Sequence, residues 1–479
     1  MSFLRSRWAP LAVLMVATWV YVLDFFVINV ALPAMQRDLG ASASSLEWVV
    51  AGYSLSTAAF LIVAGRLGDH FGRRRLFRIG LAVFVLSSAG CALAPDPTVL
   101  VIARLAQGVG SAAMAPNVLS ILGVIYVGPD RARAISIYGM VMGLAAASGQ
   151  LLGALLIDAD PAGLGWRSIF WVNVPVGVAG WLLAPRLVPE SRHERGGRID
   201  VVGAAIVTAG LVAVILPLVD GRQAGWPAWS WACLAVAPLV LAAFAAYQRR
   251  LEGVGRAPLL APALFRSAAL RAGLGTQIVF WCQQAASYLI LALYLQEVRG
   301  LGPLASGGMF TILVAGYLLT SFRAPALTER LGPAIITLGT VVAAIGDLLL
   351  LAGVVAGDPG TTVAVLAPGL LILGAGQGLC ITPLTSTMLA HADADTAGSV
   401  SGALSTMQQV GNAVGVAVTG VLFFGAARGT VGFERSLVEL AAVLGAVCLL
   451  SLRWQRIVRG ASTSRVTAAE ATAAAGPGV

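Results

Sequence analysis

The chain contains no lysine, and charged residues of either sign are scarce. Charged residues make up 11% of the 479 residues, whereas a soluble domain carries roughly a quarter. All 31 basic positions are therefore arginine, and 58% of the residues are hydrophobic. This composition excludes an ordinary water-soluble domain. Repeated apolar runs of about 20 residues predict an all-α integral membrane protein instead.

Cysteine and histidine are also rare. The five cysteines fall in apolar segments without a Cys-x-x-Cys spacing, and the three histidines fall in expected loops. We therefore expect neither a disulfide framework nor a metal site. The chain has no Walker sequence, no His-Glu-x-x-His motif and no convergent Ser/His or paired-aspartate constellation. We expect no ATP drive, no bound cofactor and no enzymatic activity, and a membrane-embedded enzyme or sensor is disfavoured.

Fourteen apolar segments are long enough to cross a bilayer. Six lie within residues 1–190, two within 191–260 and six within 261–456. This arrangement predicts two six-helix bundles with two inserted helices between them. Residues 457–479 are rich in alanine and threonine without apolar periodicity, so we expect a disordered cytoplasmic tail.

The arginines concentrate on one side of the predicted membrane. With the N-terminus in the cytoplasm, one arginine lies within a span, six lie in outer loops, and all the others lie in cytoplasmic segments. The outer six are Arg37, Arg167, Arg222, Arg299, Arg428 and Arg435. The bias predicts a multi-pass protein of the inner (plasma) membrane with both termini cytoplasmic. The net charge of +9 does not indicate nucleic-acid binding, because the arginines lie in short loops. The lipid bilayer is the expected partner of a monomeric chain.

Two short patterns recur at nearly the same offset. Residues 66–68 (RLG) recur at 330–332, and Asp130 and Ser136 recur as Asp395 and Ser401. Both pairs fall in corresponding loops of the two predicted bundles. A parallel repeat of this kind is typical of a large class of transporters. Chance similarity between loops rich in glycine and arginine is the alternative explanation.

Four motifs occur in order along the first bundle. They read LDFFVINVALP at 23–33, GRLGDHFGRRR at 65–75, RLAQGVG at 104–110 and WRSIFWVNVPVG at 166–177. Together they resemble the major facilitator superfamily, and more narrowly its fourteen-helix drug:proton antiporter branch. The resemblance implies a secondary active efflux transporter that exports lipophilic or cationic drugs or metabolites in exchange for protons by alternating access. An exporter of lipids or endogenous metabolites on the same fold is the alternative.

The second motif is expected to act as a conformational latch. In the family this loop is thought to hold the two halves together in one of the alternating states; the matched residues are Gly65, Asp69, Gly72, Arg73 and Arg74. The two glycines allow tight turns and close helix approach. Asp69 is expected to accept hydrogen bonds from a helix N-terminus, which favours an anion. A basic loop that only sets the topology is the alternative.

Polar side chains inside the predicted spans are the candidates for proton coupling and substrate contact. A charge at the centre of a span costs roughly 2.5–3.5 kcal/mol, so Arg104 is expected to be paired or to face a water-filled cavity, with Gln107 on the same helix face. The resemblance implies that Arg104 tunes a nearby carboxylate; snorkelling towards the interface is the alternative. Asp24 is expected to exchange a proton for a cation or to carry a proton, with a structural hydrogen bond as the alternative. Asp347 is the only acid clearly inside a second-half span, and Asn29 is a weaker candidate.

The fifth apolar segment carries a glycine pattern that predicts close helix packing. Its members are Gly139, Gly143, Gly149 and Gly153. The expected partner is a helix of the other half. The antiporter motif of the family usually has a proline where this chain has Gln150, and a final glycine where it has Ala154. Among the aromatic residues, Tyr53 and Tyr288 are weak candidates for the wall of an apolar cavity.

Overall fold

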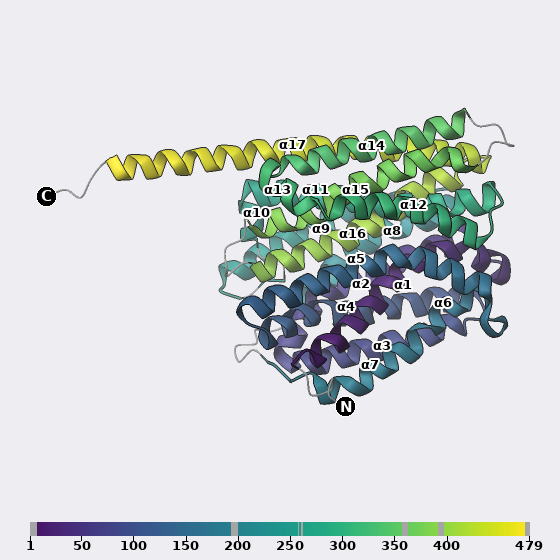
Figure 1. Cartoon of the computed structure of the whole chain (residues 1–479), viewed down its shortest axis with the longest axis horizontal. Coiled ribbons are helices and arrows are strands. Elements are labelled where there is room, and N and C mark those ends of the chain that lie inside the picture. The colour runs from purple at the N-terminus through teal and green to yellow at the C-terminus, as the bar shows by residue number, and fades with distance from the viewer. Residues whose placement is uncertain are drawn as a thin grey trace.

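Long helices run side by side through the computed structural model (Figure 1). It describes residues 7–192, 200–256, 258–259, 262–356, 363–390 and 397–474. Within this part of the chain, twelve helices are long and apolar enough to cross a membrane, and two bent helices bring the number to fourteen. The same residues contain no strand. The prediction of an all-α membrane protein is therefore confirmed.

The first half contains six spans. They are α1 (Ala9–Leu39), α2 (Ala43–Phe71), α3 (Arg73–Ala92), α4 (Pro97–Ile125), α5 (Gly128–Ala159), and the pair α6 (Ser168–Trp171) and α7 (Asn173–Leu187). Short 3-10 turns, η2 (Pro161–Gly163) and η3 (Gly165–Arg167), lead into the sixth span. The bent helices are α2 and α5.

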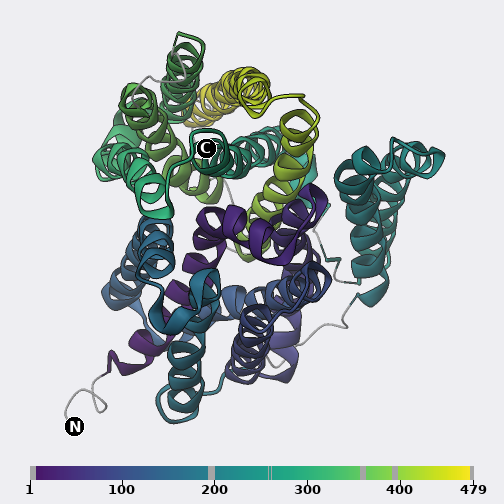
Figure 2. The same ribbon diagram turned by 90° about the vertical axis from the view of Figure 1, so that its right-hand side faces the viewer.

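Two helices follow as a separate pair, α8 (Val201–Gln223) and α9 (Ala228–Gly253). The pair stands at one side of the bundle, as Figure 2 shows. Helix α8 packs on α2 of the first half and on α16 of the second half, and α9 packs on α8. The inserted helices therefore border both halves.

The second half contains the remaining six spans and several short helices. They are α10 (Ala263–Arg266), α11 (Ala268–Leu293) with the π-helix η4 (Tyr294–Val298), α12 (Pro303–Ser321), α13 (Ala324–Leu331), α14 (Ala334–Val355), η5 (Val363–Leu366), α15 (Ala367–Ala390), α16 (Ala397–Phe424) and α17 (Gly429–Ala474). The halves meet mainly where α16 packs on α2 and where α12 packs on α5.

Local sequence sets where several helices begin. Helix α4 is capped by Asp96, whose side chain accepts the N–H of Val99, with Pro97 at the first helical position. Ser42 and Ser267 cap α2 and α11 in the same way. Polar caps at the ends of apolar runs therefore fix the loops between spans.

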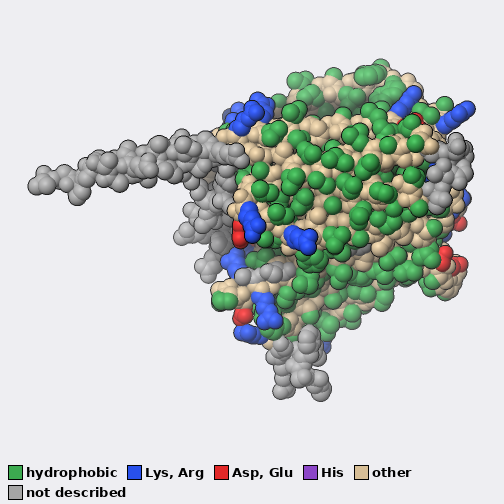
Figure 3. Space-filling view, turned by 45° about the horizontal axis from the view of Figure 1, so that its top comes forward, with side chains coloured by type: hydrophobic (Ala, Val, Ile, Leu, Met, Phe, Trp, Pro, Cys, Tyr) green, Lys and Arg blue, Asp and Glu red, His purple; other side chains and the backbone are tan. Residues whose placement is uncertain are grey.

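The outer surface has the distribution that a bilayer requires. Figure 3 shows hydrophobic side chains over the middle of one face and arginines near its edges. Exposed leucine, valine and isoleucine side chains occur on helices of both halves and of the insert, for example Leu86, Leu239 and Leu319. The chain is therefore a multi-span membrane protein in contact with lipid. We call the end formed by loops near residues 66–78, 128–133 and 249–256 the arginine-rich end, and the other the opposite end.

Contacts between the halves gather towards the opposite end. Gln296 donates to the carbonyl oxygen of Val30 at 2.9 Å. A Cβ added to Gly307 of α12 would lie 2.5 Å from the Cβ of Ala154 on α5, and one added to Gly420 would lie 2.6 Å from the carboxylate of Glu47. These contacts close the opposite end of the bundle.

The second half repeats the packing of the first. Gly72 and Gly332, both with positive φ, end the helices that precede α3 and α14. The structure therefore pairs residue 72 with residue 332. The repeated RLG pattern in the sequence pairs residue 68 with residue 332, so the two alignments differ by four residues, about one helical turn. The match between Asp130 and Asp395 has no structural outcome, since Asp395 lies outside the described residues.

The expectation of a disordered tail is wrong for residues 457–474. Helix α17 continues without a break to Ala474 and extends beyond the bundle (Figure 1). Alanine has the highest intrinsic helix propensity, and no glycine or proline occurs between residues 461 and 474. The absence of an apolar period in this segment therefore indicates that no face of it is buried. It does not indicate that the segment is unfolded.

Candidate functional site

A buried ion pair lies at the centre of the first half. The Nη1 atom of Arg104 on α4 is 2.5 Å from Oδ2 of Asp24 on α1. Both side chains are shielded from solvent, with at most 1% of either exposed. Snorkelling of Arg104 to the interface is therefore excluded, and the carboxylate beside this arginine is Asp24.

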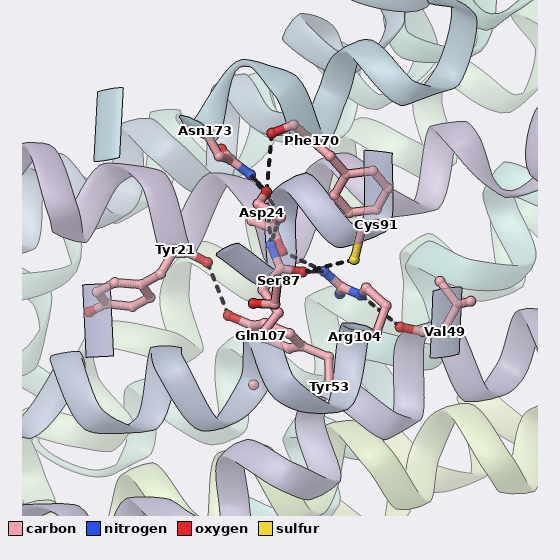
Figure 4. Close-up of polar contacts among 12 residues, drawn as sticks. Tyr21, Asp24, Val49, Tyr53, Ser87, Cys91, Arg104, Gln107, Phe170 and Asn173 are labelled. Atoms are coloured by element: carbon pink, nitrogen blue, oxygen red, sulfur yellow. Dashed lines mark hydrogen bonds and ion pairs between the residues drawn. The ribbon is translucent and has the colours of Figure 1, made fainter. Parts of the chain in front are cut away.

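The second carboxylate oxygen of Asp24 is held by two amides. Gln107 on α4 and Asn173 on α7 each donate a hydrogen bond of 2.8 Å to Oδ1 (Figure 4). Ser88 on α3 accepts longer hydrogen bonds from both amides and donates to the carbonyl oxygen of Phe170. Helices α4 and α7 thus donate directly to the carboxylate of α1, and α3 positions the two amides, the arrangement that a buried charge requires.

The guanidinium of Arg104 is satisfied by further groups. Its Nε donates to the carbonyl oxygen of Val49 at 3.0 Å, and Nη1 also donates to Oε1 of Gln107 at 2.7 Å. The ring of Tyr53 lies 4.4 Å from its central carbon, within the range of a cation–π interaction. Tyr53 therefore stabilises the ion pair and does not line the cavity, which corrects the sequence-based prediction for this residue.

Close helix contacts bring these groups together. A Cβ added to Gly108 of α4 would meet the carbonyl oxygen of Tyr53 on α2, so only glycine allows α2 and α4 this approach. The sequence analysis singled out Asp24, Arg104 and Gln107 but missed Asn173 and Ser88. Asn173 lies inside one of the quoted motifs, and its position within an apolar segment was the available signal.

A small cavity, with room for about one water molecule, lies between the halves on the other side of α1. It is lined by Phe25, Phe26 and Asn29 of α1, Val50 of α2, and Gln284, Ala285 and Tyr288 of α11. The predictions that Asn29 and Tyr288 face a cavity are consistent with this placement. Oδ1 of Asn29 has no hydrogen-bond partner among the described residues. Apolar walls with a few amides are typical of sites for small organic molecules, but in this state the cavity is far too small to hold one and would have to widen.

The sequence matches the Major Facilitator Superfamily over residues 14–416. The chain belongs to this superfamily. A probable actinorhodin transporter of Streptomyces coelicolor is 39% identical over 446 residues, covering 91% of this chain and 77% of the relative. The multidrug resistance protein Stp of Mycobacterium tuberculosis is 33% identical over 401 residues, covering 83% of this chain and 72% of the relative. The resemblance to the fourteen-helix drug:proton antiporter branch agrees with these matches.

The fold is also that of solved transporters. A crystal structure of the peptide transporter POT with bound sulfate superposes with a TM-score of 0.68, covering 94% of both chains at 17% sequence identity. At this identity the likeness concerns the fold alone. The chain is thus a transporter of the Major Facilitator Superfamily by sequence and by architecture.

In this transporter the loop predicted to be a latch is organised differently from expectation. Asp69 accepts two hydrogen bonds, of 2.9 and 2.8 Å, from the guanidinium of Arg73 one turn later. The N-terminus of α3 is bound by Glu190, whose Oε1 accepts the N–H of Arg74 at 3.0 Å. The predicted role of Asp69 as acceptor for a helix N-terminus is therefore wrong, because α3 begins at Arg73 with its N–H groups facing residues 190–191.

The two latch glycines also differ from each other. Gly72 has a φ of 108°, and an added Cβ would lie 2.8 Å from the Glu190 carboxylate. Gly65 lies within α2, and an added Cβ there would meet no described atom within 4 Å. The predicted close approach therefore holds at Gly72 and is wrong at Gly65.

The glycine pattern of α5 divides in the same way. Cβ atoms added to Gly149 and Gly153 would collide with α1, at 2.8 Å from the Cβ of Phe26 and 2.5 Å from a methyl group of Val27. At Gly139 and Gly143 no described atom lies within 4 Å. The packing prediction is therefore wrong for the first pair. For the second pair the partner is α1 of the same half.

Gln150 and Asp347 are both buried with unpartnered polar atoms. Neither amide atom of Gln150 has a hydrogen-bond partner among the described residues, and its backbone oxygen lies near Gly307 of α12. Asp347 on α14 is 1% exposed and accepts one hydrogen bond of 3.3 Å from Gln283 on α11. Asp347 lies in the second bundle and makes no contact with the Asp24 group.

Proposed function

We propose that the protein exports lipophilic compounds, cationic ones among them, across the plasma membrane in exchange for protons. The observation that carries the proposal is the position of α1. One side of this helix presents Asp24 to Arg104, and its other side presents Phe25, Phe26 and Asn29 to the cavity between the halves. Proton binding and cargo binding would then act on the same helix.

Protonation of Asp24 supplies the coupling. When Asp24 takes up a proton, Arg104 keeps its charge in a buried site but loses its counterion. Breaking a buried ion pair in this way costs about 3–5 kcal/mol unless the surroundings rearrange. A shift of α1 relative to α4 relieves this cost and changes the wall of the cavity. Alternating access follows if that shift opens the closed opposite end.

The orientation follows from the arginines. We infer that the arginine-rich end faces the cytoplasm and that an even number of spans leaves both chain ends there. The structure, closed at the opposite end, then corresponds to a state closed to the outside. A monomer is sufficient for this cycle, because both halves belong to one chain.

Coupled transport by purified protein tests the proposal. Proteoliposomes with a pH-sensitive dye inside should show proton movement when a transported dye such as ethidium is added, and Asp24→Asn should abolish that movement. Glu252→Gln is the matched control, since it removes an ion pair with Arg266 at an exposed site. Dye export that survives full collapse of the proton gradient would contradict antiport.

The cargo has two candidate ranges. One relative is named for a single compound, actinorhodin, and another for multidrug resistance. An exporter of one endogenous metabolite is therefore the second candidate, on the same fold and with the same coupling. Growth inhibition of an efflux-deleted host by a broad panel of drugs separates them, since a broad exporter protects against several unrelated compounds and a dedicated one does not.

We further propose that residues 65–74 stabilise one of the alternating states. The Asp69–Arg73 pair and the binding of Arg74 to Glu190 join α2, α3 and the end of α7, while Arg66 donates to the carbonyl oxygen of Pro258 after the insert. We expect Asp69→Asn to lower transport several-fold with unchanged membrane insertion. Vesicle transport normalised to protein amount measures this, and normal transport would remove the latch from the proposal.

A further inference from the structure

A second pocket lies inside the second half, away from the cavity between the halves. It has room for about one water molecule, and it is walled by apolar side chains of α11, α14, α15 and α17 together with Ser287 and Asp347. Oδ1 of Asp347 has no hydrogen-bond partner among the described residues, and neither has Oε1 of Gln283. Both side chains are almost fully buried, at 1% and 0% exposure. One buried acceptor without a donor, on Asp347, thus lies in the wall of the pocket, and a second, on Gln283, belongs to the residue that donates to Asp347.

The pocket corresponds to the Asp24 site of the first half. A Cβ added to Gly80 of α3 would lie 2.8 Å from the carbonyl oxygen of Gly110 on α4, and one added to Gly339 of α14 would lie 2.8 Å from that of Gly376 on α15. These glycine pairs therefore mark equivalent positions in the repeat. Counting from them, Asp347 follows Gly339 by eight residues.

Ser88 follows Gly80 by the same eight residues, so Asp347 occupies the place of Ser88. On the next helix, Gln107 precedes Gly110 by three residues and Leu373 precedes Gly376 by three. Arg104 and Leu370 are each six residues before those glycines. The second half therefore has an acid near the equivalent site, with leucines where the first half has its cation and its amide.

In the part of the chain that the structure describes, no cation compensates Asp347. Among the described residues it forms no ion pair, and the charged group that acts on it most directly is Glu439 of α17, which is also an acid. Helix α15 contributes Leu373, and α11 contributes the uncharged Gln283 and Ser287. The ring of Tyr294 on η4 is stacked at 4.0 Å on Phe433, which lines the pocket. An ionised carboxylate here would be a buried charge without a partner, which is strongly unfavourable.

We propose that Asp347 is a second proton-carrying site of this transporter, working beside the Asp24 site. A proton from the aqueous phase forms an O–H bond at the carboxylate, which supplies the missing donor. It later leaves as a proton, with the bonding electrons remaining on the carboxylate. The site takes a proton rather than the cargo, because the pocket is small and enclosed by one half, whereas cargo passes between the halves. This assignment rests on the proposed proton-driven function.

Infrared difference spectroscopy of the purified protein in lipid, without any cargo, tests the assignment. Stepping the buffer from alkaline to acidic pH should produce a carbonyl-stretch band of a buried protonated carboxyl group that titrates with pH. We expect the Asp347 component of this band, as distinct from any Asp24 component, to be lost in Asp347→Asn and in Asp347→Ser, the latter copying the residue of the first half. It should persist in Asp24→Asn and in the control Asp158→Asn, which changes an exposed acid at the end of α5.

The outcomes separate this proposal from the proposed function. A band unchanged in both Asp347 variants would overturn it, as would a band that disappears when sodium chloride replaces choline chloride at constant pH, because the site would then bind sodium. Variants that elute as monodisperse protein confirm that a lost band does not reflect misfolding.

In vesicles, Asp347→Asn should lower the number of protons moved per dye by one. Export independent of the gradient would refute antiport but leave the infrared band in place.

Discussion

At the scale of single residues, the Asp24 site shows what neutral side chains contribute to a buried charge. Asn173 and Gln107 hold one oxygen of the carboxylate while Arg104 holds the other. Hydrogen bonds to a charged group contribute about 1.5–3 kcal/mol each. Each amide therefore contributes about as much free energy to the ion-paired form of Asp24 as many charged side chains would.

We predict that Asn173→Ala lowers proton-driven export by about tenfold or more, because Asp24 loses one of its charge-stabilising donors. Dye binding in the absence of a gradient should be retained, since Asn173 does not line the cavity. Ser87→Ala is the matched control, because its hydroxyl donates only to carbonyl oxygens of its own helix. Dye efflux from everted vesicles measures the difference, and equal rates in the two variants would contradict the role of Asn173.

The sequence predicted the charged members of this site and Gln107, which shares a helix face with Arg104, but not Ser88 and Asn173. Asp24 and Arg104 stand out because a charge in an apolar span is costly wherever it points. Ser88 and Asn173 carry no such penalty, so only the packing of α3 and α7 shows that they face Asp24. The prediction for Tyr53 was wrong because only the packing shows what its ring contacts. An aromatic ring can line an apolar cavity or bind a cation, and the sequence does not distinguish the two.

At the scale of helices, small residues decide how close two elements come. Sequence spacing predicted all four glycines of α5 as packing positions, but only Gly149 and Gly153 meet another helix at close range. The period of a helix indicates which residues share a face. It does not indicate how far along that face a neighbouring helix stays in contact.

We predict opposite effects of alanine at the two ends of this pattern. Gly149→Ala places a methyl group against Phe26 and should destabilise the protein by about 1–3 kcal/mol. Gly139→Ala meets no described atom within 4 Å and should be neutral or stabilise by up to about 1 kcal/mol through helix propensity. Thermal unfolding in detergent gives the order of the two variants, and a reversed order would show that α5 packs differently.

A second element-scale feature ties the inserted helices to both halves. Glu47 of α2 is fully buried and pairs with Arg222 of α8 at 3.0 Å. Arg222 also lies 5.2 Å from the ring of Phe424 on α16, and Asp220 accepts the indole N–H of Trp48. The insert is therefore held at the opposite end by polar contacts as well as by apolar packing.

We predict an asymmetric cost of breaking this pair. Arg222→Gln leaves a buried acid without its counterion and should cost about 3–5 kcal/mol, whereas Glu47→Gln should cost less, because Arg222 is 15% exposed and can reach water. The double variant Glu47→Gln/Arg222→Gln should recover part of the loss. A thermal-stability cycle over the four proteins measures the coupling, and additive effects would show that the pair is not stabilising.

At the scale of the whole molecule, the two halves touch at one end of the interface between α5 and α12. Rocking should open that end and close the other. Spin labels at Asp158 and Leu304 report the opposite end, and labels at Arg131 and Phe322 report the arginine-rich end of the same two helices. All four positions are exposed.

We predict that the first distance lengthens and the second shortens when proton or cargo shifts the protein to its other state. Pulsed electron resonance at acidic and alkaline pH, with and without a bound dye, measures both pairs. The Asp24→Asn variant should no longer respond to pH at the opposite end. Distances that change with the same sign, or not at all, would contradict a rocking motion of the halves.

The close pairing of Arg104 with Asp24 also determines which step the membrane voltage can drive. With Asp24 ionised, the pair has no net charge, so its movement through the field requires no electrical work. With Asp24 protonated, Arg104 carries one uncompensated positive charge, whose passage across the whole field is favoured by about 2.3 kcal/mol per 100 mV. If Asp24 carries the coupling proton, as we propose, the proton-loaded step is electrogenic and the return of the first half is electrically silent. Transport then responds to voltage even when the two sides of the membrane have the same pH.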